Sequence, residues 1–236
     1  MRKSPGHRAF CGFLVVALAC SALPASAQND SKLIVPKDVP RLADATTARA
    51  KYDDLAAKVK AGDLNVDWKA LRLNARVGEV YGDYDPYDAA KRSGEAYQKG
   101  DYEGALKVAQ DTLAHNIADG DAHLAAFSCL QQLGKGSEAE EERKILLAIF
   151  DSIMKSGDGK SPQTAWFAVG IREEYLVMQF VLEVQFKQQH SWKQDGHFYD
   201  VVQVTDKDGK DQVLWFNTDT DIALLQRAGD TKRHIY

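Results

Sequence analysis

The residues best suited to chemistry are carboxylates and imidazoles in the last third of the chain. Glu173 and Glu174 lie in a segment with helical character, and His197 and Asp200 follow in a short alternating segment. A carboxylate and an imidazole that converge in a cleft can act as general acid and base in hydrolysis. Glu174, His197 and Asp200 are therefore the candidate catalytic residues. Glu173 and Glu174 cannot flank one sugar bond together, because neighbours on a helix diverge by about 100°.

A metal centre is the second chemistry to consider. His190, His197 and Asp200 would supply three ligands if neighbouring antiparallel strands brought them together. However, His197 and Asp200 are three residues apart on one expected strand, so their side chains point to opposite faces. A calcium loop starting at Asn217 is excluded, because Ile222 stands where such a loop needs glycine. The chain has neither HExxH nor paired cysteines, and we predict no metal and no cofactor.

A turn-rich segment from Gly157 to Pro162 contains Gly-Lys-Ser, which also occurs in phosphate-binding loops. Such a loop wraps phosphate with backbone N–H groups and requires another glycine five residues before its Gly-Lys pair. Met154 occupies that position, and the preceding residues have the pattern of a helix instead of a strand. The sequence therefore argues against a nucleotide site.

Tyrosines and aspartates cluster in a second turn, at residues 81–88. Tyr84, Asp85 and Tyr87 belong to it, and Tyr175 directly follows the paired glutamates. These four are the candidate ligand-binding residues, because aromatic rings beside a few polar groups can form the rim of a site for a sugar or a cation. The alternative interpretation is that the tyrosines lie over the helices with their hydroxyls in water.

Residues 46–156 have the apolar periodicity of helices. Part of this region resembles a tetratricopeptide repeat, and a shift of 34 residues places Gly100 on Gly134 and Ala105 on Ala139. The helical face could therefore form a groove for a peptide of a partner. The alternative is a helical layer that only covers the C-terminal part.

Residues 157–236 have the shorter alternation of strands, with one further helix. Together with the helices they predict an α+β protein, in which tetratricopeptide-like helical hairpins pack against an antiparallel sheet of three to four strands. We expect the two parts to form one structural unit. The expected strands cover residues 164–171, 184–192, 197–205 and 212–217, and the last helix covers 221–227.

The first 27 residues have the three parts of a secretory signal peptide. A basic start precedes an apolar run from Phe10 to Ala19, and Ala25-Ser26-Ala27 ends the segment with small residues. We predict cleavage after Ala27 and a periplasmic or secreted protein. A lipoprotein anchored at Cys20 is the less favoured alternative, because the branched residue three positions earlier is missing.

Composition excludes several classes of partner. The chain has 30 basic and 34 acidic residues, and three of the basic residues lie in the leader, so cleavage changes the formal charge from −4 to −7. Such a chain has no general attraction for nucleic acid or anionic lipid. After the leader no segment is long and apolar enough to span a bilayer. Residues 28–45, with Pro36 and Pro40, predict an extended lead segment, and Cys129 alone cannot form an internal disulfide.

Five short sequences follow one another along the chain: Asp67-x-x-x-Leu71-Arg72, Tyr84-Asp85-Pro86-Tyr87, Gly157-Asp158-Gly159-Lys160-Ser161, Glu173-Glu174-Tyr175 and His197-x-Tyr199-Asp200. In this order they resemble an uncharacterised bacterial family, domain of unknown function family 4919, across roughly residues 45–220. The resemblance implies a secreted or envelope protein with no established activity. It transfers no catalytic residues.

We therefore expect an exported binding or assembly protein of the bacterial envelope that acts without catalysis. Its expected partner is another envelope protein or a peptide, held by the helical face. The alternative is a periplasmic hydrolase with its site at the helix–sheet junction. The structure can distinguish the two. An enzyme requires its carboxylate and imidazole to meet in one cleft, whereas a binding protein requires an open groove or an apolar patch.

Export gives the first testable prediction. When the gene is expressed in a bacterial host, N-terminal sequencing of the periplasmic or secreted chain is expected to begin near Gln28. Replacing Ala25 and Ala27 by leucine should retain the precursor, because the peptidase requires small residues at these positions. A mature chain that keeps the leader would contradict export, and a lipid-modified chain starting at Cys20 would support the lipoprotein alternative.

Overall fold

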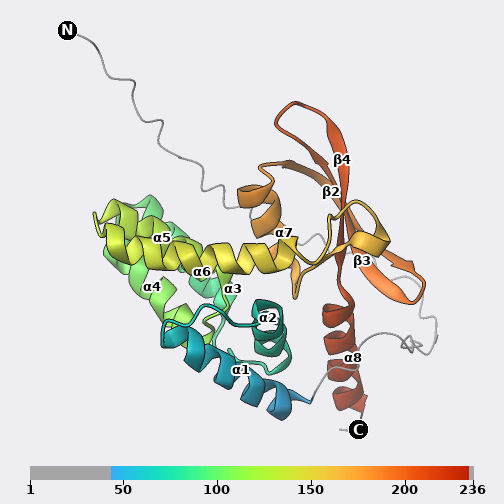
Figure 1. The fold of residues 1–236 in the computed structure, drawn as a ribbon, viewed down its shortest axis with the longest axis horizontal. Helices are drawn as coiled ribbons and strands as arrows, with labels where there is room; N and C mark the ends of the chain where they lie inside the picture. The colour runs from blue at the N-terminus through green and yellow to red at the C-terminus, as the bar shows by residue number, and fades with distance from the viewer. Residues whose placement is uncertain (1–43, 234–236) are drawn as a thin grey trace.

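The computed structural model describes residues 44–233, so the predicted leader, Cys20 and nearly all of the lead segment lie outside the described residues. Figure 1 shows a layer of helices formed by the N-terminal part of this region and a twisted sheet formed by the C-terminal part. The α+β prediction is confirmed. The helices are α1 (Ala45–Lys60), α2 (Trp68–Val77), α3 (Pro86–Gln98), α4 (Tyr102–His115), α5 (Gly120–Gln132), α6 (Gly136–Met154), α7 (Ile171–Leu176) and α8 (Asp219–Arg233). The strands are β1 (Trp166–Phe167), β2 (Gln185–Gln194), β3 (His197–Thr205) and β4 (Asp211–Asn217).

Helix α2 presents an unusual face to the protein interior. Asp67 caps the helix by accepting a hydrogen bond from the Ala70 N–H, which fixes where the helix starts. The buried residues then recur at the spacing of a helix face, and one of them is an arginine. They are Trp68, Leu71, Arg72 and Ala75, and Val77 at the end of the helix is buried as well.

Helices α3 to α6 form two antiparallel hairpins with equivalent turns. Gly100 and Gly134 adopt φ of 79° and 72°, a left-handed conformation that glycine adopts without steric cost. Five residues further on, Ala105 and Ala139 are both buried, and such small side chains allow paired helices to lie close together. The 34-residue correspondence therefore holds for the turns and these contacts. Assignment to the tetratricopeptide class stays a prediction.

The sheet has the strand order β1-β4-β3-β2. β2, β3 and β4 form the expected antiparallel meander, whose register pairs Trp192 with Tyr199 and Val201 with Trp215. The prediction of a purely antiparallel sheet is wrong, because β1 pairs in parallel with β4. The parallel edge arises because the chain passes through α7, β2 and β3 before β4 returns beside β1.

The expected strand 164–171 is reduced to two residues, and the turn before it explains why. Pro162 starts a single 3-10 turn, η1 (Pro162–Thr164), and the Thr164 carbonyl accepts hydrogen bonds from the N–H groups of Asp158 and Gly159. The Gly159 carbonyl in turn accepts from Trp215 N–H at 2.9 Å, which attaches the loop to β4. The Gly-Lys-Ser segment is therefore a structural clasp that is fixed to β4 by its main chain.

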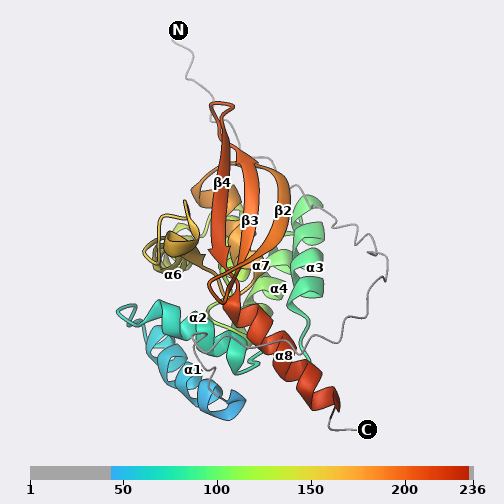
Figure 2. The same cartoon turned by 90° about the vertical axis from the view of Figure 1, so that its right-hand side faces the viewer.

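The two faces of the sheet have different environments. The inner face, with Val202, Val204, Leu214 and Phe216, joins one apolar core that also includes Leu71 of α2 and residues of α6 and α7. Figure 2 looks onto the other face, where no described helix lies over the strands. The alternation of side chains along each strand therefore divides residues between the helix-covered core and a second face, on which Tyr199 and Val201 are still buried.

The last helix is longer than predicted. α8 extends past the expected range of residues 221–227 and continues through Gly229 to Arg233, since an isolated glycine costs a helix only about 1 kcal/mol. In the part of the chain that the structure describes, none of the helices combines the length and the apolar character needed to cross a bilayer.

The clasp predicts a difference between two glycines. Gly159 and Gly209 both have positive φ, but a Cβ on Gly159 would lie 2.4 Å from the Trp166 ring, whereas a Cβ on Gly209 meets nothing within 4 Å. Gly159→Ala is expected to lower the free energy of unfolding by about 3 kcal/mol or more, through overpacking added to strain. Gly209→Ala should cost about 1–2 kcal/mol, from strain alone. Urea denaturation measures both, and equal losses would contradict the clasp.

Candidate functional site

A buried guanidinium joins the helical layer to the sheet. Arg72 forms an ion pair with Glu173 of α7, and its Nε donates to Ser152 Oγ of α6 at 2.9 Å. Glu173 also accepts from the Val169 N–H at 2.9 Å. Burial raises the pKa of Glu173, and the neighbouring Arg72 opposes that effect. Because the charges of Arg72 and Glu173 neutralise each other, this pair links the elements structurally. Neither side chain is left unpaired to act on a substrate.

A cavity of about 590 Å³ lies beside this pair, between α2, the start of α5, α7 and α8. Its walls carry both signs of charge. Arg76 and Asp221 pair across it at 3.0 Å, and Arg172 enters from α7. A space of this size is in the range of small-molecule sites. The candidate catalytic residues Glu174, His197 and Asp200 are not among the residues that line this cavity.

Arg172 is the centre of the polar network in this cavity. Its Nε donates to Asp121 Oδ2 at 2.5 Å, and its Nη1 donates to Asp119 Oδ2 at 3.2 Å. The Tyr81 hydroxyl donates to Asp119, and burial together with that carboxylate raises the pKa of Tyr81 and keeps it protonated. Withdrawal from water raises the pKa of Asp121 to about 6, although Arg172 acts in the opposite direction. The Arg172 guanidinium also lies 5.3 Å from the centre of the Tyr87 ring.

The loop that carries Asp119 is held in place by a buried histidine. His123 lies 2.8 Å from the Ile117 carbonyl through Nε2 and 2.6 Å from Glu142 through Nδ1. Asp119 itself caps α5 by accepting from the Ala122 N–H. The acidic side of the network is therefore fixed by α5 and α6 before any ligand arrives.

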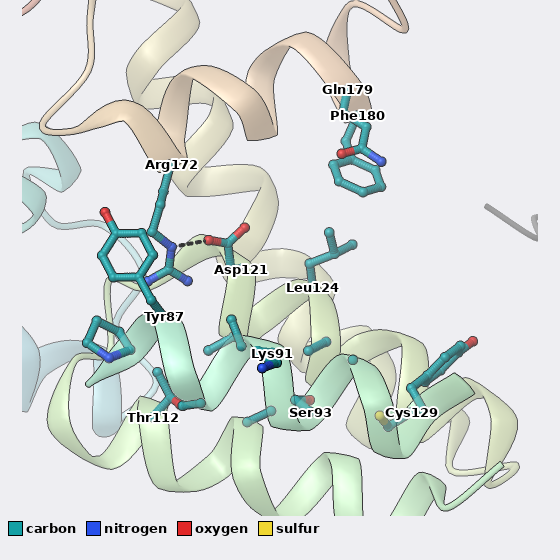
Figure 3. A pocket seen from close by; sticks show the side chains of 18 residues that line it. Tyr87, Lys91, Ser93, Thr112, Asp121, Leu124, Cys129, Arg172, Gln179 and Phe180 are labelled. Atoms are coloured by element: carbon teal, nitrogen blue, oxygen red, sulfur yellow. Dashed lines mark hydrogen bonds and ion pairs between the residues drawn. The ribbon is translucent and has the colours of Figure 1, made fainter. Parts of the chain in front are cut away.

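A second cavity of about 340 Å³ follows α3 and α5 away from this network (Figure 3). Tyr87, Asp121 and Arg172 line both cavities, so they form the wall between them. Figure 3 shows Phe180 above the groove and Cys129 at the end away from Tyr87. Small side chains make up most of its length, including Ala89, Ser93, Gly94, Ala122 and Ala125. We call this cavity the α3–α5 groove.

The three candidate catalytic residues do not converge. Gln189 Nε2 donates to Asp200 Oδ2 at 2.7 Å and to Glu174 Oε2 at 3.3 Å, so Glu174 and Asp200 share one amide. His197 instead contacts Asp219 Oδ2 at 2.7 Å, on the opposite face of β3 from Asp200, as the strand spacing predicts. Glu174 has no exposed surface. A catalytic set built on these three residues is therefore absent from this arrangement.

The buried carboxyl of Glu174 is unusual in another way. Its Oε1 has no hydrogen-bond partner in the described residues. Burial raises the pKa of Glu174 to about 9, and the nearby carboxylates of Asp200 and Asp221 act in the same direction. The group is therefore neutral at physiological pH and has no route to a substrate.

The four candidate ligand-binding residues have different roles. Tyr84 packs on His115 at 4.3 Å between ring centres and hydrogen-bonds Thr112, while Asp85 caps α3. Tyr175 packs against Phe186, beside the sheet. Of the four, Tyr87 lines the two cavities. No group of three or more potential metal ligands is found between residues 44 and 233.

Sequence reasoning missed the residues that build the site. Arg72 could have been found, because it stands at a buried position of an otherwise apolar helix face. Asp119, Asp121 and Arg172 had no such signal, since acidic residues at a helix start and a basic residue in a charged run are ordinary surface patterns. Their convergence depends on the distance between α5 and α7, which the sequence alone does not define.

The sequence matches the family model described as domain of unknown function DUF4919 over residues 78–225. The chain belongs to this family. No curated protein and no solved structure matches it.

The DUF4919 match contains both walls of the α3–α5 groove and the whole of β1 to β4. The matched region begins at Gly78, just after α2. The resemblance in the short sequences was expected to begin earlier, at about residue 45. Arg72, which anchors Glu173, therefore lies before the matched region.

The pKa of Glu174 gives a prediction about stability. The pKa of Glu174 is about 9 in the folded protein, above its ordinary value of 4.5. The contribution of the protonated carboxyl to the free energy of unfolding is therefore complete below about pH 4.5 and is lost as the pH rises through 9. Glu174→Gln keeps the neutral shape and should unfold at a temperature about 4 °C or more above wild type at pH 8, but not at pH 4. Exposed Glu103→Gln is the control and should change little at either pH. A lower midpoint for Glu174→Gln at pH 8 would mean that the ionised carboxylate is stabilised.

Proposed function

We propose that this protein is exported to the bacterial envelope and binds a segment of a partner protein in the α3–α5 groove, without catalysis. The observation that carries the proposal is the shape and lining of the groove. It has a floor of small side chains, a volume of about 340 Å³ and a polar end formed by Asp121 and Arg172. Grooves of this kind accept the side chains of a bound peptide, with a few polar groups fixing its orientation.

Exposed aromatic residues at the rim support binding of a protein segment. The side chains of Tyr87 and Phe180 are 62% and 37% exposed, although both are large and line the groove. Aromatic residues on a surface are enriched where partners bind, because they bury a large area with little loss of conformational freedom. The rim and floor together favour a partner segment over a single small ligand.

The placement of the candidate catalytic residues supports binding over catalysis. Glu174 is enclosed, and His197 is held by Asp219 on the other face of β3. A periplasmic hydrolase remains the second candidate because of one observation. Asp121 lines both cavities and has a pKa of about 6, the range in which a carboxyl can act as general acid or base near neutral pH.

A pair of glycines provides the test. A Cβ on Gly94, in the groove, or on Gly136, at the exposed start of α6, would meet nothing within 4 Å, so both positions accept a side chain. Gly94→Trp should fill the groove and abolish cross-linking of the mature chain to its partner in intact cells. Gly136→Trp should leave the cross-link unchanged, and both variants should unfold near the wild-type temperature.

Two results would count against the proposal. A stoichiometric partner that still cross-links to Gly94→Trp would place the interface elsewhere. A hydrolytic activity of the purified chain that Asp121→Asn removes, while Gly136→Trp keeps it, would favour the hydrolase.

A further inference from the structure

Strand β2 is the long free edge of the sheet. The order β1-β4-β3-β2 puts it at one end, and its ten residues pair with β3 on one side only. The opposite edge, β1, is two residues long. The outward N–H and C=O groups of an edge strand are a template for another strand, so proteins commonly cover or shorten such edges. Within residues 44–233, β2 is neither covered nor short. It carries two lysines and a bulge near Phe186, which limit unselective pairing and favour a strand of opposite charge.

The side chains of β2 are exposed along nearly the whole strand. Eight of the ten residues are exposed, including Phe186 and Trp192, with 47% and 49% of their surface accessible. These two lie on opposite faces, because the register shifts between Phe186 and Gln188. A strand added at this edge would cover both aromatic side chains at once, and their burial would add to the main-chain hydrogen bonds.

The charge of β2 indicates what such a strand would carry. The segment contains Lys187, His190 and Lys193 and no acidic residue, in a chain whose formal charge is −4. Lys187 is paired with Asp211 at 2.5 Å, whereas Lys193 lies over the Phe198 ring and forms no ion pair with a carboxylate of residues 44–233. Opposite charges on neighbouring strands stabilise pairing.

The same charges disfavour two other occupants. Antiparallel pairing of two copies about His190 would place Lys187 directly opposite Lys193, and like charges in that position are destabilising. The lead segment of this chain carries Pro36 and Pro40, which have no N–H to donate to a ladder, and it has no acidic excess.

We propose that β2 is a docking edge for an extended acidic segment of a partner protein, which adds to the sheet as a further strand. This surface is distinct from the α3–α5 groove and does not depend on it. The added strand would be recognised by its main chain and by carboxylates near His190 and Lys193.

Two capped ten-residue peptides test the edge in the full mature chain, one repeating Val-Val-Glu-Glu and one repeating Val-Val-Lys-Lys, so that charges lie on both faces of the added strand, as His190 and Lys193 do on β2. The glutamate peptide should bind at least about tenfold more tightly and should slow hydrogen exchange in β2. His190→Glu combined with Lys193→Glu should reverse the preference. Lys207→Glu combined with Lys210→Glu, at the exposed hairpin tip, is the matched control and should retain it.

The proposal fails under three outcomes. The first is that neither peptide binds at concentrations up to about 1 mM. The second is that the β2 variant keeps the wild-type preference between the peptides. The third is that sedimentation shows a dimer that the β2 variant disrupts. The last result would identify a second copy as the occupant. Gly94→Trp should bind the glutamate peptide normally, so failure of the groove and failure of the edge can be told apart.

Discussion

Within residues 44–233, the placement of the helices against the sheet depends on one buried ion pair. The Arg72 side chain has no exposed surface, and its guanidinium contacts Glu173, Ser152 and the carbonyl of Phe167, so it joins α2, α6, α7 and β1. Removing water from such a pair offsets most of the attraction between its charges, so its main effect is on geometry. Loss of one partner leaves the other charge buried, which costs about 3–5 kcal/mol. The helices and the sheet are therefore held in one relative position.

The three charged residues that begin α7 point to three different parts of the protein. Arg172 contacts Asp119 and Asp121 beside α5, Glu173 contacts Arg72, and Glu174 shares Gln189 with Asp200 in the sheet. Successive residues on a helix are about 100° apart, so a helix of six residues can reach all three directions. The short helix α7 acts as a connector, and its position is set by the clasp around Gly159 and Trp166 that precedes it.

The same network limits the chemistry of the junction. Most charged groups there are already paired, as Arg76 with Asp221 and Arg172 with Asp119 show. A site whose charged groups are already paired with one another suits recognition better than catalysis, because catalysis requires a group that is free to exchange a proton with substrate. Accessible aromatic side chains lie at the groove, with Tyr87 and Phe180, and along β2, with Phe186 and Trp192.

The sequence was enough to predict the helical and strand regions, the turn glycines and the divergence of His197 from Asp200, because these follow from local periodicity and backbone preference. It could not give the parallel pairing of β1 with β4, since that depends on where a distant strand returns. It also could not show that Arg172 meets Asp119 or that Glu174 loses its contact with water. Those features are non-local. They arise from the packing of α5, α7 and the sheet around Arg72, which brings together residues that are far apart in the sequence.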